Sequence, residues 1–443
     1  MAWINSIYLS FRFFQAVMLL VILFVIGYLI DWFYPFVIGI AVIFLVTILV
    51  EFYLLFFTKN GVNAQRITPK KMSNGDYNDI HLLIKNNYRF DIRAQVIDEI
   101  PYQFQYRHSN WIRKIQGRAE DNLHYQLRPI KRGEYHFGNI MIYISTQFHF
   151  IQRRFKEGVP EMVPVYPSIV QMKKYGFVAI SNRLQEFGLK KIRRLGHTME
   201  FEQIRNYTPG DDPRTINWKA SARTNTLMIN NYQDEKSQPV YFIIDKGRLM
   251  RFPFGGLSLL DYAINAALIM ANIALKKEDK AGVITFSNKL SSIVPATKKS
   301  DQLRKILEIL FNQKTQYKES NFELLSQYIN RHIRHRSLLL TFTNFESLSS
   351  FRRQLPFFIQ LQKLHTVVIV FFKNKELNDF IHQEDNTLEQ IYSQTIAEEY
   401  EADKYLITKE LRKYGIHSIL TYPEDLNISV INKYLELKAR GVI

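Results

Sequence analysis

The sequence predicts a transmembrane helical hairpin, then a β-sandwich, then an α/β domain with a doubly wound, mostly parallel sheet. Two long apolar runs open the chain, at residues 13–30 and 35–57. Residues 61–170 alternate apolar and polar side chains, as half-buried strands do. After residue 239, short apolar runs alternate with helical patterns, which is typical of a parallel sheet covered on both faces. We therefore expect a two-helix anchor at 1–60, a β-sandwich at 61–170, a basic, irregular segment at 171–238 and an α/β domain at 239–443.

Each apolar run is long enough to cross a bilayer. The runs would form helices of roughly 27 and 34 Å, against a hydrocarbon core about 30 Å thick. Only Asp31 to Tyr34 separate them, so the helices return antiparallel and both ends of the hairpin lie on one side. A cleaved signal peptide is a competing interpretation of the first run, although a second span follows at once and no Ala-x-Ala site is present. A buried core hairpin is the other alternative.

Flanking charge indicates the side on which the rest of the chain lies. The loop between the runs carries only Asp31. The basic residues nearest the outer ends of the two runs are Arg12, Lys59, Arg66, Lys70 and Lys71. By the positive-inside rule, both termini and the soluble domains are expected in the cytoplasm. Glu51 interrupts the second run near its cytoplasmic end, where a carboxylate can reach the interface or take a partner.

Composition narrows the functional classes. The 443 residues include no cysteine, which excludes disulfides, a thiolate nucleophile and a thiolate zinc site. The formal charge of +17 suits an anionic partner. We expect this partner to be the anionic inner leaflet of the membrane, because a tethered body always lies beside it. Nucleic acid comes second, since no recognition motif accompanies the charge.

The α/β pattern is most regular after residue 239. Apolar strands are expected at residues 240–245, 281–286, 337–342 and 366–372, with helices between them. One such helix is marked by an i, i+3, i+4, i+7 stripe at Leu303, Ile306, Leu307 and Leu310. The segment 415–441 supplies a further strand and a closing helix.

The densest group of polar residues lies at 196–223, in "GHTMEFEQIRNYTPGDDPRTINWKASAR". Pro209-Gly210 predicts a turn, and Asp212-Pro213 predicts a helix start. Such a helix would place Arg214 and Trp218 on one face. The acidic and basic side chains nearly balance. They indicate either a docking platform or a structural ion-pair network, and both interpretations stay open.

The run "RNYTPGDDPRTINWKASAR" resembles the signature of the bacterial domain-of-unknown-function 58 (DUF 58) family. The matching positions are Tyr207, Gly210, Asp211, Arg214, Ile216, Trp218, Ser221, Ala222 and Arg223. The segments "LRPIKRGEYHFG" at 127–138 and "YLELKARG" at 434–441 are similar to other parts of the family pattern. With the N-terminal hairpin, the resemblance covers nearly the whole chain.

The resemblance implies a protein of the bacterial inner membrane whose last domain is similar to von Willebrand factor A domains. Such proteins are commonly linked to MoxR-type AAA+ ATPases, in systems thought to assemble or activate other complexes. We therefore expect a non-enzymatic interaction protein with a MoxR-type partner. The expected partner-binding or structural positions are Arg205, Tyr207, Gly210, Asp211, Arg214, Trp218, Ser221 and Arg223.

The resemblance also implies where a metal would bind. Von Willebrand A domains often hold Mg²⁺ with an Asp-x-Ser-x-Ser motif at the carboxyl ends of the strands. The corresponding run starts at Asp245 and has Gly247 and Leu249 in place of the two serines. Ser320 and Asn344 stand where a Thr and a later Asp are expected. We expect a degenerate metal site (MIDAS) with no metal and no cofactor.

In place of a metal ligand, Asp245 is expected to form an internal ion pair with Lys246 or Arg248. The surface around Asp245, Arg248, Ser320 and Asn344 is expected to dock a partner.

Two other functional classes remain. An enzyme acting on envelope or lipid substrates would use carboxylates of the 200–212 segment, and would need two of them in an open cleft with perturbed pKa values. A basic nucleic-acid binder would show strong, steeply salt-dependent binding to DNA.

Overall fold

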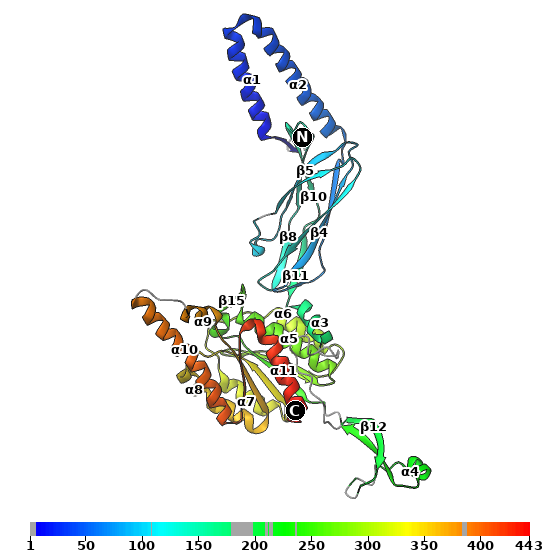
Figure 1. Cartoon of the computed structure of the whole chain (residues 1–443), viewed down its shortest axis with the longest axis vertical. Helices are drawn as coiled ribbons and strands as arrows, with labels where there is room; N and C mark the ends of the chain where they lie inside the picture. Colours follow the sequence, from blue (N-terminus) through cyan, green and yellow to red (C-terminus); the bar gives the residue numbers. More distant parts are fainter. Residues whose placement is uncertain are drawn as a thin grey trace. The chain divides into compact units, whose positions relative to one another are not determined.

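The computed structural model describes residues 6–107, 109–178, 198–208, 211, 216–234, 237–382 and 388–443. The chain divides into two compact units, Met1–Tyr166 and Pro167–Ile443 (Figure 1). The basic run at residues 190–194 lies outside the described residues. The first unit holds two helices and the strands of a β domain, and the second holds an α/β domain and a separate β-hairpin.

The first unit starts with a short strand, continues with two long helices and ends with ten strands. Its elements are β1 (Ile7–Leu9), α1 (Phe11–Leu29), α2 (Tyr34–Phe57), β2 (Val62–Ile67), β3 (Met72–Ser73), β4 (Asn78–Asn86), β5 (Ile92–Asp98), β6 (Asn110–Ile115), β7 (Glu120–Leu127), β8 (Gly133–Phe137), β9 (Ile140–Ser145), β10 (Ile151–Glu157) and β11 (Glu161–Tyr166).

The two N-terminal helices fit a membrane anchor. Both are long and apolar enough to span a bilayer, and only 6% of the first span and 11% of the second are buried. A third helix, α5 (Leu259–Lys276), meets the same length and composition criteria but is 78% buried. It packs in the core of the α/β domain. The expected apolar hairpin is therefore confirmed in its helices.

Glu51 joins α2 to the β domain. Its carboxylate accepts hydrogen bonds from the Thr146 hydroxyl at 2.5 Å and from the backbone N–H groups of Phe150 and Ile151, both at 3.1 Å. The Arg153 guanidinium donates to the carbonyls of Leu55, Thr58 and Lys59 at the end of the helix, at 2.5, 2.6 and 3.0 Å. The expectation that Glu51 takes a partner is confirmed.

The chain is also fixed to the β domain before the first helix. β1 pairs antiparallel with β10, with Leu9 opposite Ile151. The sequence analysis missed this strand, because three residues ahead of an apolar helix carry no readable alternation. Both ends of the α1–α2 hairpin are therefore attached to one domain.

The β domain is built around one core. A five-stranded sheet, β1-β10-β9-β5-β6, and two three-stranded sheets, β2-β4-β7 and β3-β11-β8, share it. Along β4 every second residue is buried, as expected for a strand with one face toward a core. The expected β-rich region is confirmed.

The second unit alternates strands and helices after its β-hairpin. Its elements are α3 (Ile169–Val178), β12 (Thr198–Asn206), α4 (Trp218–Thr224), β13 (Met228–Asp234), β14 (Pro239–Asp245), β15 (Pro253–Phe254), β16 (Leu257–Ser258), α5, β17 (Lys280–Phe286), β18 (Leu290–Thr297), α6 (Gln302–Phe311), α7 (Phe322–His332), β19 (Leu338–Phe342), α8 (Leu348–Leu364), β20 (Thr366–Phe372), α9 (Lys375–Ile381), α10 (Leu388–Lys413), β21 (His417–Thr421) and α11 (Leu426–Ala439).

The α/β domain has a six-stranded sheet in the order β18-β17-β14-β19-β20-β21. All neighbouring pairs are parallel except β17–β18, which is antiparallel at one edge. The expected strands are confirmed to within one residue at each end. Since β14 lies between β17 and β19, the chain winds outward from it in both directions.

Helices cover both faces of this sheet. Phe242 and Ile244 of β14 face a core completed by α5, α6 and α11. The residue between them, Ile243, faces the opposite core, which α7, α8 and α10 complete. Strand residues on both faces are thus buried, which explains the nearly continuous apolar runs in the sequence.

Candidate functional site

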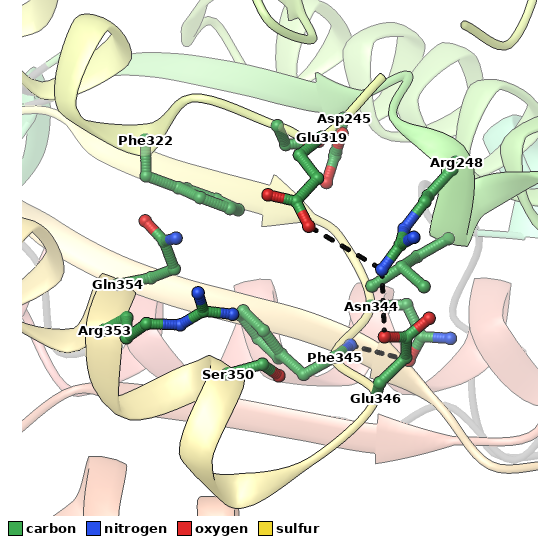
Figure 2. Close-up of a pocket in the computed structure, with 12 residues that line it drawn as sticks. Asp245, Arg248, Glu319, Phe322, Asn344, Phe345, Glu346, Ser350, Arg353 and Gln354 are labelled. Carbon is green, nitrogen blue, oxygen red and sulfur yellow. Dashed lines mark hydrogen bonds and ion pairs between the residues drawn. The ribbon is translucent and has the colours of Figure 1, made fainter. Parts of the chain in front are cut away.

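The strand ends at the centre of the sheet form the first candidate site. The sheet order changes direction between β14 and β19, and in open α/β sheets ligands bind beside the carboxyl ends of the strands at such a point. Asp245 ends β14, and Thr343 and Asn344 directly follow β19. A small pocket of ≈ 80 Å³ lies here (Figure 2). Its lining includes Asp245, Arg248, Leu249, Ser320, Asn344 and Glu346.

Asp245 is buried and fully engaged by hydrogen bonds. It accepts one from the Thr343 hydroxyl at 2.7 Å, one from the Gly247 N–H at 2.7 Å and one from the Ser320 hydroxyl. Burial raises the pKa of Asp245, although these three hydrogen bonds oppose the shift. The carboxyl group holds three loops together.

Gly247 makes room for Ser320. A Cβ atom at position 247 would lie 2.1 Å from the Ser320 Oγ. A side chain at position 247 would therefore clash with the hydroxyl of Ser320, which occupies the space beside Asp245. The expected meeting of Asp245, Gly247 and Ser320 is found.

The expected ion pair of Asp245 with Lys246 or Arg248 is wrong. Arg248 extends instead toward Glu346 and Glu319, at 3.2 and 3.6 Å (Figure 2). Lys246 is buried, and burial lowers its pKa. The hydroxyls of Ser320 and Thr343 satisfy Asp245 at lower desolvation cost than a buried ion pair would.

Asn344 binds a lysine of the same chain. The ammonium of Lys404, on α10, donates to the Asn344 Oδ1 at 2.7 Å and to the Phe345 carbonyl. Its Nζ also lies 4.9 Å from the centre of the Tyr400 ring. Burial lowers the pKa of Lys404 to about 7, while the charges of Glu346 and Asp403 oppose the shift.

These residues do not fit Mg²⁺. Such an ion needs a near-octahedral set of oxygens, including one or two carboxylates. The Asp245 carboxylate is taken by three donors, and the two exposed carboxylates beside it, Glu319 and Glu346, bind Arg248. In the described part of the chain, no group of three or more His, Asp or Glu side chains is placed to hold a metal.

A second, larger pocket adjoins the first. It has a volume of ≈ 530 Å³ and shares Asn344 and Glu346 with the small pocket. Most of its lining is apolar and comes from the segment after β14, the end of β20, and α9 and α10. At its edge Phe252 and Ile396 are 51% and 59% exposed. The strand ends therefore present a charged pocket beside an apolar one.

The β12–β13 hairpin carries the second candidate site. These two strands pair only with each other among the described strands. At the start of the connection, Arg205 forms a two-pronged ion pair with Asp211, with nitrogen–oxygen distances of 2.6 and 3.0 Å. Asp211 also accepts from the Thr208 N–H at 2.9 Å. The hydrogen bond from Arg205 is the main reason that the pKa of Asp211 is lowered.

The short helix α4 is fastened to the hairpin by polar side chains. Asn217 caps it by accepting from the Ala220 N–H at 3.0 Å. The Ser221 hydroxyl donates to the Asn217 carbonyl and accepts from the Met228 N–H, both at 2.8 Å. Tyr207 contributes through its backbone N–H, which donates to the Leu227 carbonyl at 2.8 Å.

The predicted helix start at Asp212-Pro213 lies outside the described residues. Ile216 forms a bridge with Ile229 of β13, and the helix begins only at Trp218. Asn217 caps α4, and Trp218 is its first residue. Gly210 and Arg214 lie outside the described residues.

Trp218 and Arg223 remain exposed on α4. Trp218 is 71% exposed, and Leu227 and Ile204 of the hairpin are 47% and 38% exposed. Thus Arg205, Asp211 and Ser221 stabilise the hairpin, whereas Trp218 and Arg223 are available at its surface. The hydrogen bonds described for the hairpin join only residues of the hairpin and α4. The hairpin and the strand ends are therefore two separate candidate sites.

Sequence reasoning missed Thr343 and Lys404. Thr343 directly precedes Asn344, and its hydroxyl could have been proposed from its place after an apolar strand. Lys404 follows Asn344 by sixty positions, on another helix, and no local pattern marks a lysine that will be buried.

A family of known proteins matches the part of the chain that contains both candidate sites. Residues 203–380 match the family model described as "Protein of unknown function DUF58". A segment of 124 residues is 27% identical to the uncharacterized protein YeaD of Bacillus subtilis (strain 168). It covers 28% of this chain and 30% of that relative, so the match spans less than a third of the relative's length.

Two solved structures are also similar to part of the chain. The CARDB domain of a Pyrococcus furiosus protein is 12% identical, with a TM-score of 0.17, and covers 24% of this chain and 86% of its own. A PapD-like domain of human CEP192 is 11% identical, with a TM-score of 0.19; the match covers 25% of this chain and 87% of the CEP192 domain. The family model alone confirms the resemblance to DUF58 proteins, and it does so over residues 203–380 and not over nearly the whole chain. This segment includes β13, α4 and the strand-end residues Asp245, Ser320 and Asn344.

Proposed function

We propose that this protein is a non-enzymatic adaptor anchored in a bacterial inner membrane, with both termini and its soluble domains in the cytoplasm. Its α/β domain is of the von Willebrand factor A type with a degenerate metal site. The partner is a protein, and a MoxR-type AAA+ ATPase that assembles or activates other complexes is the partner that the family resemblance favours.

The exposed apolar surface of the hairpin carries this proposal. Trp218, Leu227 and Ile204 expose apolar area on a sheet of only two strands. Two-stranded hairpins are marginally stable in water, and tryptophan is enriched among residues that dominate protein interfaces. A protein partner that covers Trp218 would stabilise the hairpin and gain binding energy from the same contact.

The strand ends support the same role. The apolar pocket of ≈ 530 Å³ beside Asn344 is large enough to take apolar side chains of a partner. The neighbouring Arg248, Glu319 and Glu346 are about half exposed or more, as in the polar rim of an interface.

The described carboxylates of the two sites, Asp211 and Asp245, favour binding over the alternative of an envelope- or lipid-directed enzyme. Asp211 is held in an ion pair with Arg205, and its pKa is lowered, which is unfavourable for a general acid or base at neutral pH. Asp245 is 2% exposed and its oxygens accept three hydrogen bonds.

The test is recovery of partners from solubilised membranes. A Trp218→Ala variant of the full chain should lose the partner that the wild-type chain retains, and a MoxR-type ATPase should be among the lost proteins. The matched control is Tyr102→Ala, which removes an aromatic side chain that is 86% exposed in the β domain. Equal recovery by both variants and the wild type would show that Trp218 has only a local role.

The anchor is tested separately. Alkaline carbonate removes peripheral proteins from membranes and leaves spanning proteins in them, so the full chain should stay in the pellet. A reporter that is active only in the cytoplasm should be active when it is fused to the C-terminus. Release of the chain into the soluble fraction would contradict the anchor without affecting the pull-down argument.

A further inference from the structure

The β domain has a pocket at the end from which the two apolar helices leave. The loop at residues 146–150 binds Glu51 of α2 through Thr146 and Phe150. The same loop lies beside β1, because Ser10, the residue before α1, bonds to the Phe150 carbonyl through its backbone N–H at 3.0 Å. A pocket of ≈ 440 Å³ is lined by this loop, the start of β5 and the end of β6. It is therefore next to both ends of the helical hairpin.

Cationic side chains line this pocket. Arg93 of β5 and Arg113 and Lys114 of β6 are its three positive groups. Its one carboxylate, Asp91, pairs with Lys114 at 3.4 Å. Arg93 and Arg113 form no ion pair with any described residue, and both are exposed. The lining thus has two guanidinium groups without a counter-ion, which suits an anion.

Arg12, in the first turn of α1, adds to the same positive field. His149 lies in the pocket wall and is partly buried. Burial lowers the pKa of His149, and the charges of Arg93 and then Arg12 lower it further, against a smaller opposing effect of Glu51. Arg12 of α1 and Arg93 of β5 therefore both act electrostatically on one imidazole of the pocket wall.

Exposed apolar side chains occur in the pocket lining and in the segments joined to it. Ile112 of β6 lines it and is 58% exposed, and Phe148, in the loop, is 55% exposed. Phe11, at the start of α1, is 77% exposed. Unpaired guanidinium groups beside exposed apolar side chains match the two parts of a lipid, an anionic headgroup and hydrocarbon. A nucleic acid or a soluble phosphate compound would gain nothing from the apolar part.

We propose that this pocket binds the phosphate of an anionic phospholipid, with Arg93 and Arg113 as its main contacts. The acyl chains lie along the exposed apolar surface of α1 and α2. The inference rests on the proposed membrane anchor and adds a specific site to it. The bound lipid fills the angle between the anchor and the β domain, so the domain is held at one depth relative to the headgroups.

The experiment uses the full chain in nanodiscs made from phosphatidylcholine with added phosphatidylglycerol. Native mass spectrometry after gentle release counts the phosphatidylglycerol molecules that stay bound. The test variant is Arg93→Gln/Arg113→Gln. The matched control is Lys70→Gln/Lys131→Gln, which removes two exposed charges from the opposite end of the β domain. Lys70 follows the far end of β2, and Lys131 follows β7, whose last residue Leu127 pairs with Asn78 at that same end.

The affinity for phosphatidylglycerol should fall by roughly one order of magnitude or more in the test variant and stay near wild type in the control. Arg93→Lys/Arg113→Lys keeps the charge and should retain a large part of the affinity. The inference is overturned if the test and control variants retain equal amounts of this lipid, or if inorganic phosphate displaces it as well as lipid does. Absence of the chain from the nanodisc fraction would instead overturn the anchor.

Discussion

Lys404 places a buried amino group beside the carboxyl end of β19. Its ammonium contacts Asn344 and the Phe345 carbonyl within the protein interior. These contacts tie the loop after β19 to α10, which packs on one face of the sheet.

The depressed pKa of Lys404 predicts a pH dependence of stability. An unfolded lysine titrates near 10.4, whereas burial holds the folded pKa at about 7. Between these values the unfolded state binds more protons, so this group makes the protein more stable as pH rises from about 7 toward 10. The melting temperature of wild type minus that of Lys404→Met should increase over this range, measured on the detergent-solubilised chain.

Lys409→Met is the control for this effect, because Lys409 is exposed on the same helix. Its difference from wild type should stay flat with pH. A flat difference for Lys404→Met as well would mean that its ammonium stays charged in the folded protein.

Asp245→Asn should be tolerated near neutral pH. The folded pKa of Asp245 is raised by burial, so its contribution to stability is present below the unfolded pKa of about 3.9 and is lost as pH rises through the folded value. An asparagine oxygen can accept from Ser320 and Gly247, and its amide can donate to Thr343. The variant should gain stability over wild type from acid toward neutral pH, in thermal unfolding of the full chain.

Asp245→Leu is the contrasting variant. It leaves the Gly247 N–H and two hydroxyls without an acceptor, at about 1–3 kcal/mol each when buried. Micromolar Mg²⁺ binding by calorimetry that disappears in Asp245→Ala would contradict the degenerate-site interpretation.

Glu51 shows how one polar residue in an apolar helix decides what that helix contacts. Its carboxylate satisfies two backbone N–H groups and one hydroxyl of the 146–151 segment. Glu51→Leu should destabilise the β domain by about 1–3 kcal/mol per donor left unsatisfied. Amide hydrogen exchange at Phe150 and Ile151 should become faster in the detergent-solubilised variant.

Thr47→Val is the matched control in the same helix. The Thr47 hydroxyl donates to the Ile43 carbonyl within α2, at 2.8 Å, and contacts no strand. Exchange at Phe150 should be unaffected in that variant. Unchanged exchange in Glu51→Leu would mean that the loop holds its conformation without α2.

The sequence was most informative for elements with a complete periodic pattern. The four apolar strands of the α/β sheet and the two long apolar helices follow from patterns that are local to each segment. β1 and β18 were missed, because each becomes a strand only by pairing with an open edge formed elsewhere. In the segment that follows Asp212, the described residues begin with Ile216, which bridges to Ile229, and the helix α4 begins at Trp218, a pairing that the local pattern did not indicate.

The candidate site was predictable in part. Asp245, Ser320 and Asn344 were placed together because strand ends and their loops meet at one edge of a sheet. Their partners were not predictable: whether Asp245 meets a cation or hydroxyls depends on how the loop from Lys318 to Ser320 approaches Gly247, which no local pattern encodes.

The two units of the chain have separate apolar cores. Buried residues of the β domain form one cluster, and the two faces of the α/β sheet form the others, with no buried residue shared between the units. A cavity at Ile142 of β9 should therefore lower the melting temperature of the β domain alone. A cavity at Leu340 of β19 should lower the melting temperature of the α/β domain alone. Each large-to-small change should cost about 2–5 kcal/mol.

Differential scanning calorimetry of the full chain in detergent checks this prediction. Ile142→Ala and Leu340→Ala should each shift one of two transitions. A single transition that moves equally in both variants would show that the units unfold together.

The attachment of the anchor at both of its ends has a mechanical consequence. A span joined to its domain by one flexible linker can swivel freely, but this hairpin enters through β1 and leaves through the contacts of Glu51 and Arg153. Tilting of the helices in a thinner or thicker bilayer therefore applies torque to the β domain instead of being absorbed by a joint. With the anchor proposed above, the thickness of the lipid bilayer would then influence the orientation of the β domain at the membrane surface.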